Sequence, residues 1–330
     1  MTQVEDREAD AEPAQVGAGA KLDMRQVARD ISYASSAATG VGRTLIRLME
    51  NATGRIGLIR RAEGYDEEVA AGRDFWAVMA ERYGLSLDVV RGALTDIPAE
   101  GPLIVVANHP YGILDGLMLG HMLSVTRGDF RILAHRVFKK AEDIDRVILP
   151  ISFEESKDAV ALNLETRKEA LRYLSEGGCI GIFPGGTVST AAKPLGRPMD
   201  PNWRAFTAKM VAKSGATVVP VYFDGANSRL FQLASHLHST LRMGLLIREF
   251  RARIGTPVRV AIGEPIGPER LAEFRGDPKK LMDFLRAETY SLSQKPLADA
   301  GLGFEFEAKH RTDRKAEHGA KPRKGLKDRY

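Results

Sequence analysis

Residues 108–116 read Asn-His-Pro-Tyr-Gly-Ile-Leu-Asp-Gly and follow directly after an apolar run. A neutral imidazole can take a proton from an alcohol near physiological pH. It does so best when a carboxylate accepts a hydrogen bond from its other nitrogen, because that bond fixes the tautomer and stabilises the imidazolium. Pro110 and Gly112 favour a tight turn, which would return the Asp115 carboxylate to the His109 ring. The stretch predicts a general base with its orienting carboxylate; the alternative is a helix-capping aspartate beside a loop histidine without a chemical role.

A second segment with chemical potential is Phe-Pro-Gly-Gly-Thr at residues 183–187, which also ends an apolar run. Two consecutive glycines let backbone N–H groups approach an anion closely, and Thr187 adds a hydroxyl. The segment is not a Walker A loop, because the Gly-Lys-Ser/Thr ending is missing. Taken alone, an ordinary tight turn remains the alternative.

Six short apolar runs rich in β-branched residues predict the strands that would position these segments, at 103–107, 131–135, 147–153, 179–183, 217–223 and 258–262. Helical periodicity separates most of them, at 114–124, 156–176 and 202–214. Nearly continuous apolar strands that alternate with helices predict an α/β fold, with a mostly parallel central sheet flanked by helices. In such sheets ligands bind outside the carboxyl ends of the strands, where both candidate segments lie.

The composition divides the chain into regions. Residues 1–20 are predicted to be an acidic disordered N-terminus, and residues 21–94 a helical N-terminal region. Residues 95–300 form the α/β domain, and residues 301–330 are predicted to be a basic disordered tail. Within the domain, 230–254 predicts an amphipathic helix or a pair of helices, and a final helix is predicted near 278–292.

Several classes of protein are disfavoured by composition. The 330 residues, 44% of them hydrophobic, are enough for a sizeable core. The single cysteine, Cys179, excludes a disulfide framework and a cysteine-rich metal site. No His/Asp/Glu spacing indicates zinc, so neither a metal nor a cofactor is expected. There is no apolar stretch of about 18 residues that would span a bilayer, and no signal-peptide pattern.

The formal net charge of +5 is concentrated at the C-terminus. Residues 309–330 hold nine Lys or Arg against three Asp or Glu, so the rest of the chain is nearly neutral. Such a tail binds nucleic acid or anionic lipid surfaces, or only keeps the protein in solution. No basic surface interleaved with aromatic residues supports nucleic acid, so that partner is not expected.

Together, in their order along the chain, the segments resemble the glycerolipid (lysophospholipid) acyltransferase superfamily. Its first motif, an Asn-His followed by a downstream Asp, is matched by Asn108, His109 and Asp115. Its third motif, Phe-Pro-Glu-Gly-Thr-Arg-Ser, is matched by Phe-Pro-Gly-Gly-Thr-Val-Ser at 183–189, and its fourth, an apolar strand with an embedded proline, by 218–221. The chain looks most like a divergent bacterial branch called hemolysin-like, which includes acyltransferases of ornithine-lipid synthesis.

The resemblance implies a glycerol-3-phosphate acyltransferase-like fold and an O-acyltransferase. That enzyme would move a fatty acyl group from acyl-CoA or acyl carrier protein to a lyso-lipid hydroxyl in membrane lipid biosynthesis. His109 would be the general base and Asp115 its orienting carboxylate, and the activated oxygen would attack the thioester directly. The implied substrate-binding residues are Asn108, Gly112, Pro184, Gly185, Gly186, Thr187, Lys157 and Arg136.

The chain also departs from the family's pattern. Five residues, rather than four, separate His109 from Asp115, and the motif-three glutamate and arginine are replaced by Gly185 and Val188. The second motif's arginine is absent after the strand at 147–153. In the family these groups help hold a phosphorylated glycerol acceptor, so a different acceptor is expected. The candidate replacement cations are Arg136, Lys139, Lys157 and Arg229.

An acceptor of this class lies in a bilayer, which implies a peripheral protein on the inner, cytoplasmic face of the cytoplasmic membrane. Residues 41–61 and 237–254 combine Leu/Ile faces with arginines, as interfacial helices do, although core-facing helices show the same pattern. Two other functions are open: a non-catalytic lipid-binding protein on the same fold, and a serine hydrolase. The absence of Gly-x-Ser-x-Gly argues against the hydrolase.

Overall fold

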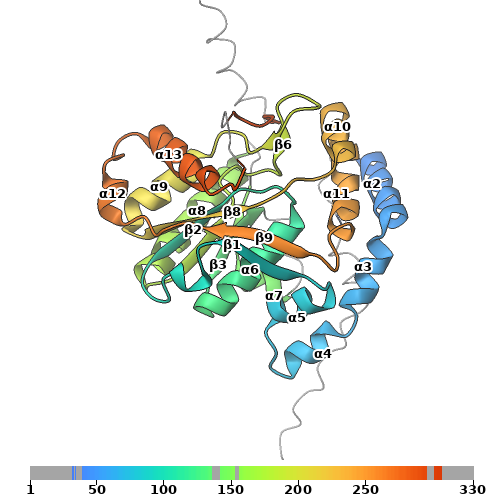
Figure 1. The fold of residues 1–330 in the computed structure, drawn as a ribbon, viewed down its shortest axis with the longest axis horizontal. Helices are drawn as coiled ribbons and strands as arrows, with labels where there is room; N and C mark the ends of the chain where they lie inside the picture. The colour runs from blue at the N-terminus through green and yellow to red at the C-terminus, as the bar shows by residue number, and fades with distance from the viewer. Residues whose placement is uncertain are drawn as a thin grey trace, which may run out of the picture.

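A computed structural model describes residues 32, 34, 39–135, 142–152, 156–295 and 301–306. The described part forms a seven-stranded sheet in the order β1-β9-β8-β2-β5-β3-β4 (Figure 1). The strands are β1 (Ser86–Arg91), β2 (Leu103–Ala107), β3 (Arg131–His135), β4 (Ile148–Ile151), β5 (Cys179–Ile182), β8 (Thr217–Phe223) and β9 (Pro257–Ile262). The five strands from β8 to β4 are parallel, whereas β9 is antiparallel to β8 and parallel to β1.

The predicted α/β fold with a mostly parallel sheet is confirmed, and all six predicted strands are present. The prediction of a helical region over 21–94 is wrong for Ser86–Arg91, which forms β1 at the edge of the sheet. Its side chains are exposed or half-buried, so β1 lacks the apolar run that announces a buried strand. A short hairpin of β6 (Thr190–Ala191) and β7 (Pro198–Met199) was also not predicted.

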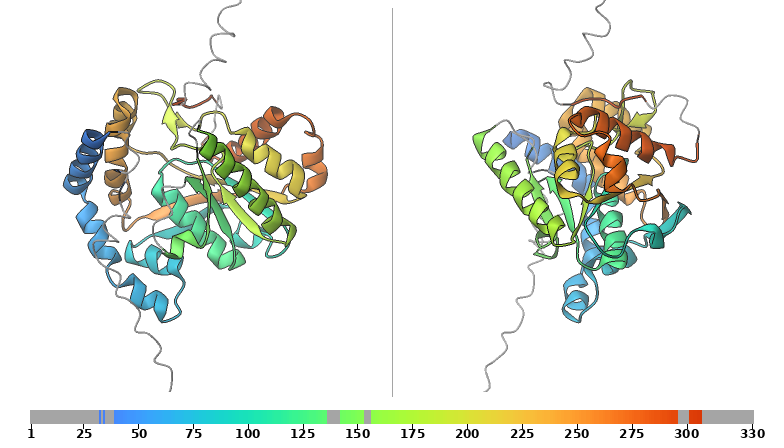
Figure 2. Two further views of the ribbon diagram at one scale, coloured as in Figure 1. Left: turned by 180° about the vertical axis from the view of Figure 1, so that it is seen from behind. Right: turned by 90° about the vertical axis from the view of Figure 1, so that its left-hand side faces the viewer.

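Strand β2 shows why the sequence run is continuously apolar. Its five side chains are fully buried, and they alternate between two layers. Leu103, Val105 and Ala107 pack toward α5 (Phe75–Arg82) and α6 (Ile113–Arg127). Ile104 and Val106 pack toward the other layer, where Figure 2 shows a helix lying across the sheet. The helices of that layer are α8 (Lys157–Ser175), α9 (Ala205–Ser214), α12 (Pro268–Ala272) and α13 (Pro278–Ser291).

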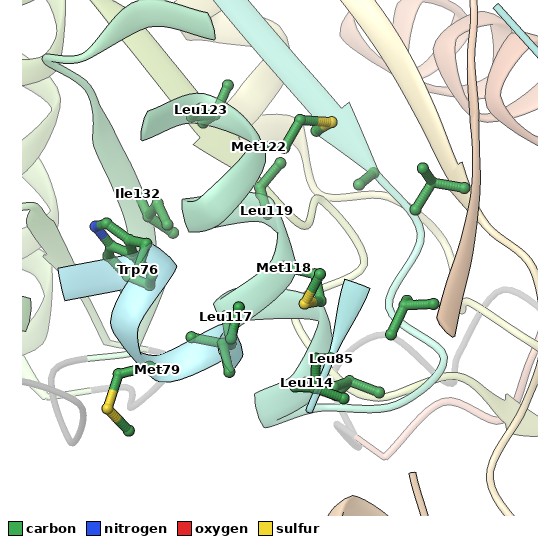
Figure 3. Close-up of a cluster of buried hydrophobic side chains, with 14 of the residues drawn as sticks. Trp76, Met79, Leu85, Leu114, Leu117, Met118, Leu119, Met122, Leu123 and Ile132 are labelled. Atoms are coloured by element: carbon green, nitrogen blue, oxygen red, sulfur yellow. The ribbon is translucent and has the colours of Figure 1, made fainter. Parts of the chain in front are cut away.

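Helices α5 and α6 pack in close contact through Trp76 and Gly120. Figure 3 shows the Trp76 side chain beside the buried leucines and methionines of α6. A side-chain carbon on Gly120 would lie 2.2 Å from the Trp76 ring, so only glycine lets the indole lie against α6. The Phe75 ring packs edge-on against the same indole, and the Phe130 ring packs against it at a tilt. Helix α5 therefore belongs to the core of the sheet although it precedes residue 95, and the domain boundary at that residue stays a prediction.

A smaller helical group packs beside the sheet. It consists of α2 (Gly40–Thr53), α3 (Arg55–Ala62), α10 (Arg229–Leu237) and α11 (Ser239–Arg251), and α11 contacts the other three (Figure 1). The segment predicted as a helix or a pair is thus a pair. The remaining helices are α4 (Tyr65–Ala70), η2 (Leu94–Asp96) and α7 (Glu142–Asp145).

The predicted disordered ends need one correction. Residues 1–20 and 307–330, which include nearly all of the basic tail, lie outside the described residues. Residues 301–306, in contrast, form a strap on the folded domain: Gly303 N–H donates to the Asp200 carbonyl and Phe304 N–H donates to the Thr190 carbonyl. The prediction of disorder is therefore wrong for these six residues.

Candidate active site

Asp115 lies in the first turn of α6, and its side chain is fully buried. Its Oδ2 accepts hydrogen bonds from the backbone N–H groups of Tyr111 (2.8 Å) and Gly112 (2.9 Å) and lies 3.0 Å from His109 Nδ1. Gly112 has a φ of 91°, which favours glycine and lets the chain turn sharply into α6. The structure thus brings the two side chains together, and the same carboxylate also caps the helix.

Burial raises the pKa of the Asp115 carboxyl above its ordinary value, although the adjacent His109 ring and the hydrogen bonds from the Tyr111 and Gly112 backbone N–H groups act in the opposite direction. The contact with Asp115 favours the tautomer in which Nδ1 of His109 carries the proton. Nε2 is then the nitrogen left to accept a proton. The His109 side chain is 19% exposed, so part of its ring is open to solvent.

The His109 residue is held through both its ring and its backbone. The ring stacks on Phe183, with centroids 4.3 Å apart. The backbone N–H donates to Asp200 Oδ1 (3.2 Å), and the carbonyl accepts from the Ser189 N–H (2.8 Å). The segment at 183–189 therefore lies directly against the histidine loop, as the two carboxyl-edge segments were expected to do.

Asn108 uses its side chain to join two strands. Its Oδ1 accepts from the Phe223 N–H (2.7 Å), and its Nδ2 donates to the Phe223 carbonyl (3.0 Å). The residue is buried, and both polar atoms of its amide are engaged with the end of β8. This geometry favours a positioning role for Asn108 over the predicted substrate contact.

Asp200 is a fully buried carboxylate that was missed in the sequence. Besides the His109 N–H, its Oδ1 accepts from the Ser189 hydroxyl, and its Oδ2 accepts from Trp203 Nε1 (3.0 Å). A side-chain carbon on Gly185 would lie 3.2 Å from Asp200 Cβ and Cγ. The space beside this glycine, where the family motif has glutamate, thus holds a carboxylate from another segment. Nothing in the local sequence marks Asp200, because it follows the unpredicted β7.

Arg242 was also missed, since it lies on α11 among other arginines. Its Nη2 donates to the Thr187 hydroxyl (3.0 Å) and to the Val188 carbonyl (2.8 Å). Its guanidinium packs between the rings of Phe231 and Phe306, with 5.1 Å and 4.2 Å to the ring centroids. A guanidinium therefore reaches the segment that lacks the motif-three arginine, and it orients the Thr187 hydroxyl.

Two of the predicted cations, Lys157 and Arg229, lie in the described structure and do not join the site. Lys157 is exposed at the start of α8 and, among the described residues, makes no hydrogen bond or ion pair. Arg229 is exposed on α10 and donates to the Leu195 carbonyl (2.7 Å). Arg136 and Lys139 lie outside the described residues. Pro184 and Gly186 lie in the segment against His109, and Gly186 has a φ of 67°.

Other chemistries find little support in the described ranges. They contain no group of three or more His, Cys, Asp or Glu placed to hold a metal ion. Cys179 is fully buried in β5, and burial raises the pKa of its thiol to about 12. A thiol of this kind is a poor nucleophile, because the thiolate is the reactive form.

The comparison with protein families identifies the class. A family model described as "Acyltransferase" matches residues 69–301, so the chain belongs to this acyltransferase family and is an enzyme of that type. The predicted superfamily resemblance is thereby confirmed.

Two similar proteins add detail. The lyso-glycine lipid O-acyltransferase of Phocaeicola vulgatus is 23% identical over 234 residues, which cover 69% of this chain and 80% of that protein. The crystal structure of the 1-acyl-sn-glycerophosphate acyltransferase PlsC from Thermotoga maritima aligns with a TM-score of 0.43 and 18% identity. That alignment covers 77% of this chain and 97% of the other.

Proposed function

We propose that this protein is an O-acyltransferase that moves a fatty acyl group from acyl-CoA or acyl carrier protein to the hydroxyl of a lyso-lipid. The observation that carries the proposal is the 3.0 Å approach of His109 Nδ1 to Asp115 Oδ2 at the carboxyl edge of a parallel sheet. Membership of the acyltransferase family supports the reaction type.

In this mechanism Nε2 of His109 takes the proton of the acceptor hydroxyl as its oxygen attacks the thioester carbonyl carbon. The new C–O bond forms and the C–S bond breaks. The leaving thiolate then takes the proton from the imidazolium, so the histidine is restored. Asp115 stabilises the transient imidazolium and holds the ring in the required tautomer. No covalent acyl-enzyme is needed.

The acceptor proposed is a lyso-amino-acid lipid, of the glycine or ornithine kind. The similarity to a lyso-glycine lipid O-acyltransferase supports this class. Gly185 and Val188 also replace the two groups that the family pattern associates with a phosphorylated glycerol.

The proposed place of action is the cytoplasmic face of the cytoplasmic membrane, because acyl thioesters are made inside the cell while the acceptor lies in the bilayer. In the part of the chain that the structure describes, no helix is both long and apolar enough to cross a membrane.

The deciding experiment is a transfer assay with purified full-length protein. The acceptors are lyso-glycine lipid, lyso-ornithine lipid and lysophosphatidic acid, each offered with acyl-CoA and with acyl carrier protein. The expected result is an acylated amino-acid lipid, detected by mass spectrometry, and little product from lysophosphatidic acid.

Variants connect the activity to the site. His109→Ala is expected to abolish transfer, whereas His121→Ala, in the middle of α6, should retain it. A folded His109→Ala protein with wild-type transfer rates would refute the assigned base. A wild-type protein that binds lyso-lipid without transferring an acyl group would favour the non-catalytic alternative.

A further inference from the structure

Helix α2 exposes an apolar stripe to solvent. Val41, Leu45 and Leu48 are 81%, 43% and 62% exposed. Their spacing of four and three residues places them on one side of the helix. On its other side α2 buries Ile46 against α11, so the exposed stripe takes no part in the packing between these two helices.

Helix α10 carries a second stripe of the same kind. Leu230, Leu233 and Leu237 are 50%, 41% and 76% exposed and again share one side of their helix. Helices α2 and α10 both pack on α11, and they lie near each other at one side of the molecule (Figure 1). We refer to the two stripes together as the α2–α10 face.

Helix α11 itself does not contribute to this face, so the interfacial interpretation of residues 237–254 is wrong for α11 and holds only for Leu237, the last residue of α10. Leu245 and Leu246 are 7% and 3% exposed and pack in the core of the helical group. For α11, the core-facing alternative is therefore the correct one.

The face is connected to the candidate active site through the same core. Ile46 of α2 and Phe231 of α10 belong to a buried cluster that includes Val188, and Ile113 packs against this cluster. Val188 follows Thr187, and Ile113 lies between His109 and Asp115. The buried sides of α2 and α10 thus pack, through this cluster, against the segments that carry Thr187, His109 and Asp115.

The exposed charges on the two helices of the face have one sign. Glu50, the one acidic residue of α2 and α10, is buried. The exposed charged side chains of α2 and α10 are the arginines Arg43, Arg47 and Arg229. Amphipathic helices that carry exposed leucines and arginines bind the interface of an anionic bilayer, since the leucines enter the acyl region while the cations meet lipid phosphates.

We propose that the α2–α10 face docks on an anionic lipid bilayer and thereby holds the enzyme at the membrane that contains the acceptor. The choice of a bilayer as occupant rests on the proposed function, in which the acceptor is a membrane lipid. Docking raises the local concentration of the acceptor around the enzyme.

The first test is flotation of full-length protein with vesicles of phosphatidylglycerol and phosphatidylethanolamine. Two double variants, Leu45→Glu with Leu48→Glu and Leu233→Glu with Leu237→Glu, alter the face. Val160→Glu with Leu164→Glu is the matched control, because these residues of α8 are 56% and 46% exposed on the other layer of the fold. Circular dichroism and thermal unfolding confirm that each variant is folded.

We expect each face variant to lower vesicle binding by about tenfold or more, because a charge replaces buried apolar area at the interface. The control should bind like the wild type. Arg43→Gln with Arg47→Gln should weaken binding to anionic vesicles only. Wild-type binding by both face variants, or an equal loss in the α8 control, would overturn the proposal. So would a wild-type protein that forms a dimer through this face and binds no vesicles.

The second test separates docking from catalysis. Acyl transfer is measured to a long-chain acceptor in vesicles and to a short-chain acceptor dispersed in buffer. Docking predicts that the face variants lose transfer only to the vesicle-bound acceptor. If the wild type acylates neither acceptor, the proposed function fails while flotation still decides the docking surface. If the variants lose transfer to both acceptors equally, the docking proposal fails.

Discussion

One carboxylate oxygen of Asp115 contacts both His109 and the backbone N–H groups of Tyr111 and Gly112, which lie just before α6. The catalytic and the capping interpretations of this aspartate are therefore compatible. A single buried carboxylate can fix the turn and the tautomer together.

Asp115→Asn is expected to lower kcat by about 10²–10⁴-fold, because a neutral amide neither stabilises the imidazolium nor reliably keeps the proton on Nδ1. The same change should cost about 1 kcal/mol of stability through the weaker cap. Steady-state kinetics and urea unfolding measure the two effects. An unchanged kcat in a folded Asp115→Asn protein would contradict the assigned orienting role.

Asp200→Asn is expected to lower kcat while KM stays nearly constant. An asparagine has a single acceptor oxygen, so it cannot accept from both the His109 N–H and the Trp203 Nε1–H. One buried donor is then left unsatisfied, at a cost of about 1–3 kcal/mol, and the two donors compete for the oxygen that supports the His109 loop. Glu68→Gln is the control, since its carboxylate pairs with Arg82 rather than with the histidine loop. A rise in KM alone would show that Asp200 does not position His109.

Cys179→Ala tests direct transfer. Because the thiol is fully buried and its pKa is raised to about 12, the alanine variant should keep wild-type kcat. Its stability should fall by about 1 kcal/mol through the loss of one buried sulfur. Loss of activity in a folded Cys179→Ala protein, or an acyl group found on this cysteine by mass spectrometry, would contradict the mechanism.

Among the secondary-structure elements, α6 carries both the site and the core. Its N-terminus holds Asp115, and its middle packs against α5 through Gly120. The helix was predicted from its apolar residues, but the close approach of Trp76 was not, because a glycine in a helix does not reveal which side chain lies above it.

Gly120→Ala is expected to destabilise the protein by about 1–3 kcal/mol, because the added methyl group would overlap the Trp76 ring. Gly116→Ala in the same helix has no heavy atom within 4 Å of the new carbon, so it should be neutral or stabilise by up to about 1 kcal/mol. Urea unfolding of both variants provides the comparison. Equal effects would show that α5 and α6 do not pack as described.

At the scale of the whole molecule, the strap at residues 301–306 packs across segments that are distant in the sequence. Glu305 forms a bidentate ion pair with Arg204, at 2.9 Å and 3.0 Å, and Phe306 packs on the Arg242 guanidinium. The strap thus lies over the two residues, Asp200 and Arg242, that support the catalytic loops.

Truncation after residue 300 should therefore lower both the unfolding midpoint and the transfer rate. Truncation after residue 306 removes the basic tail but keeps the strap, so it should preserve both properties. Thermal unfolding and the transfer assay compare the two chains. If both truncations behave alike, the strap does not support the site.

Much of this protein was accessible from sequence. Buried strands of a parallel sheet are continuously apolar, and the order of two motifs is linear information, so the fold class, His109 and Asp115 could be predicted. Strand β1 and the β6–β7 hairpin could not, because their residues lack that apolar signal.

What required the tertiary structure were the contacts between distant segments. Asp200 reaches His109 across 91 residues and Arg242 reaches Thr187 across 55, and no local pattern announces either pair. Likewise, the sequences of α2, α10 and α11 are all amphipathic, and only packing decides that α11 is covered while the leucines of α2 and α10 face outward. Periodicity shows that a helix has an apolar face, whereas the neighbours of that face are set by the three-dimensional arrangement of the whole chain.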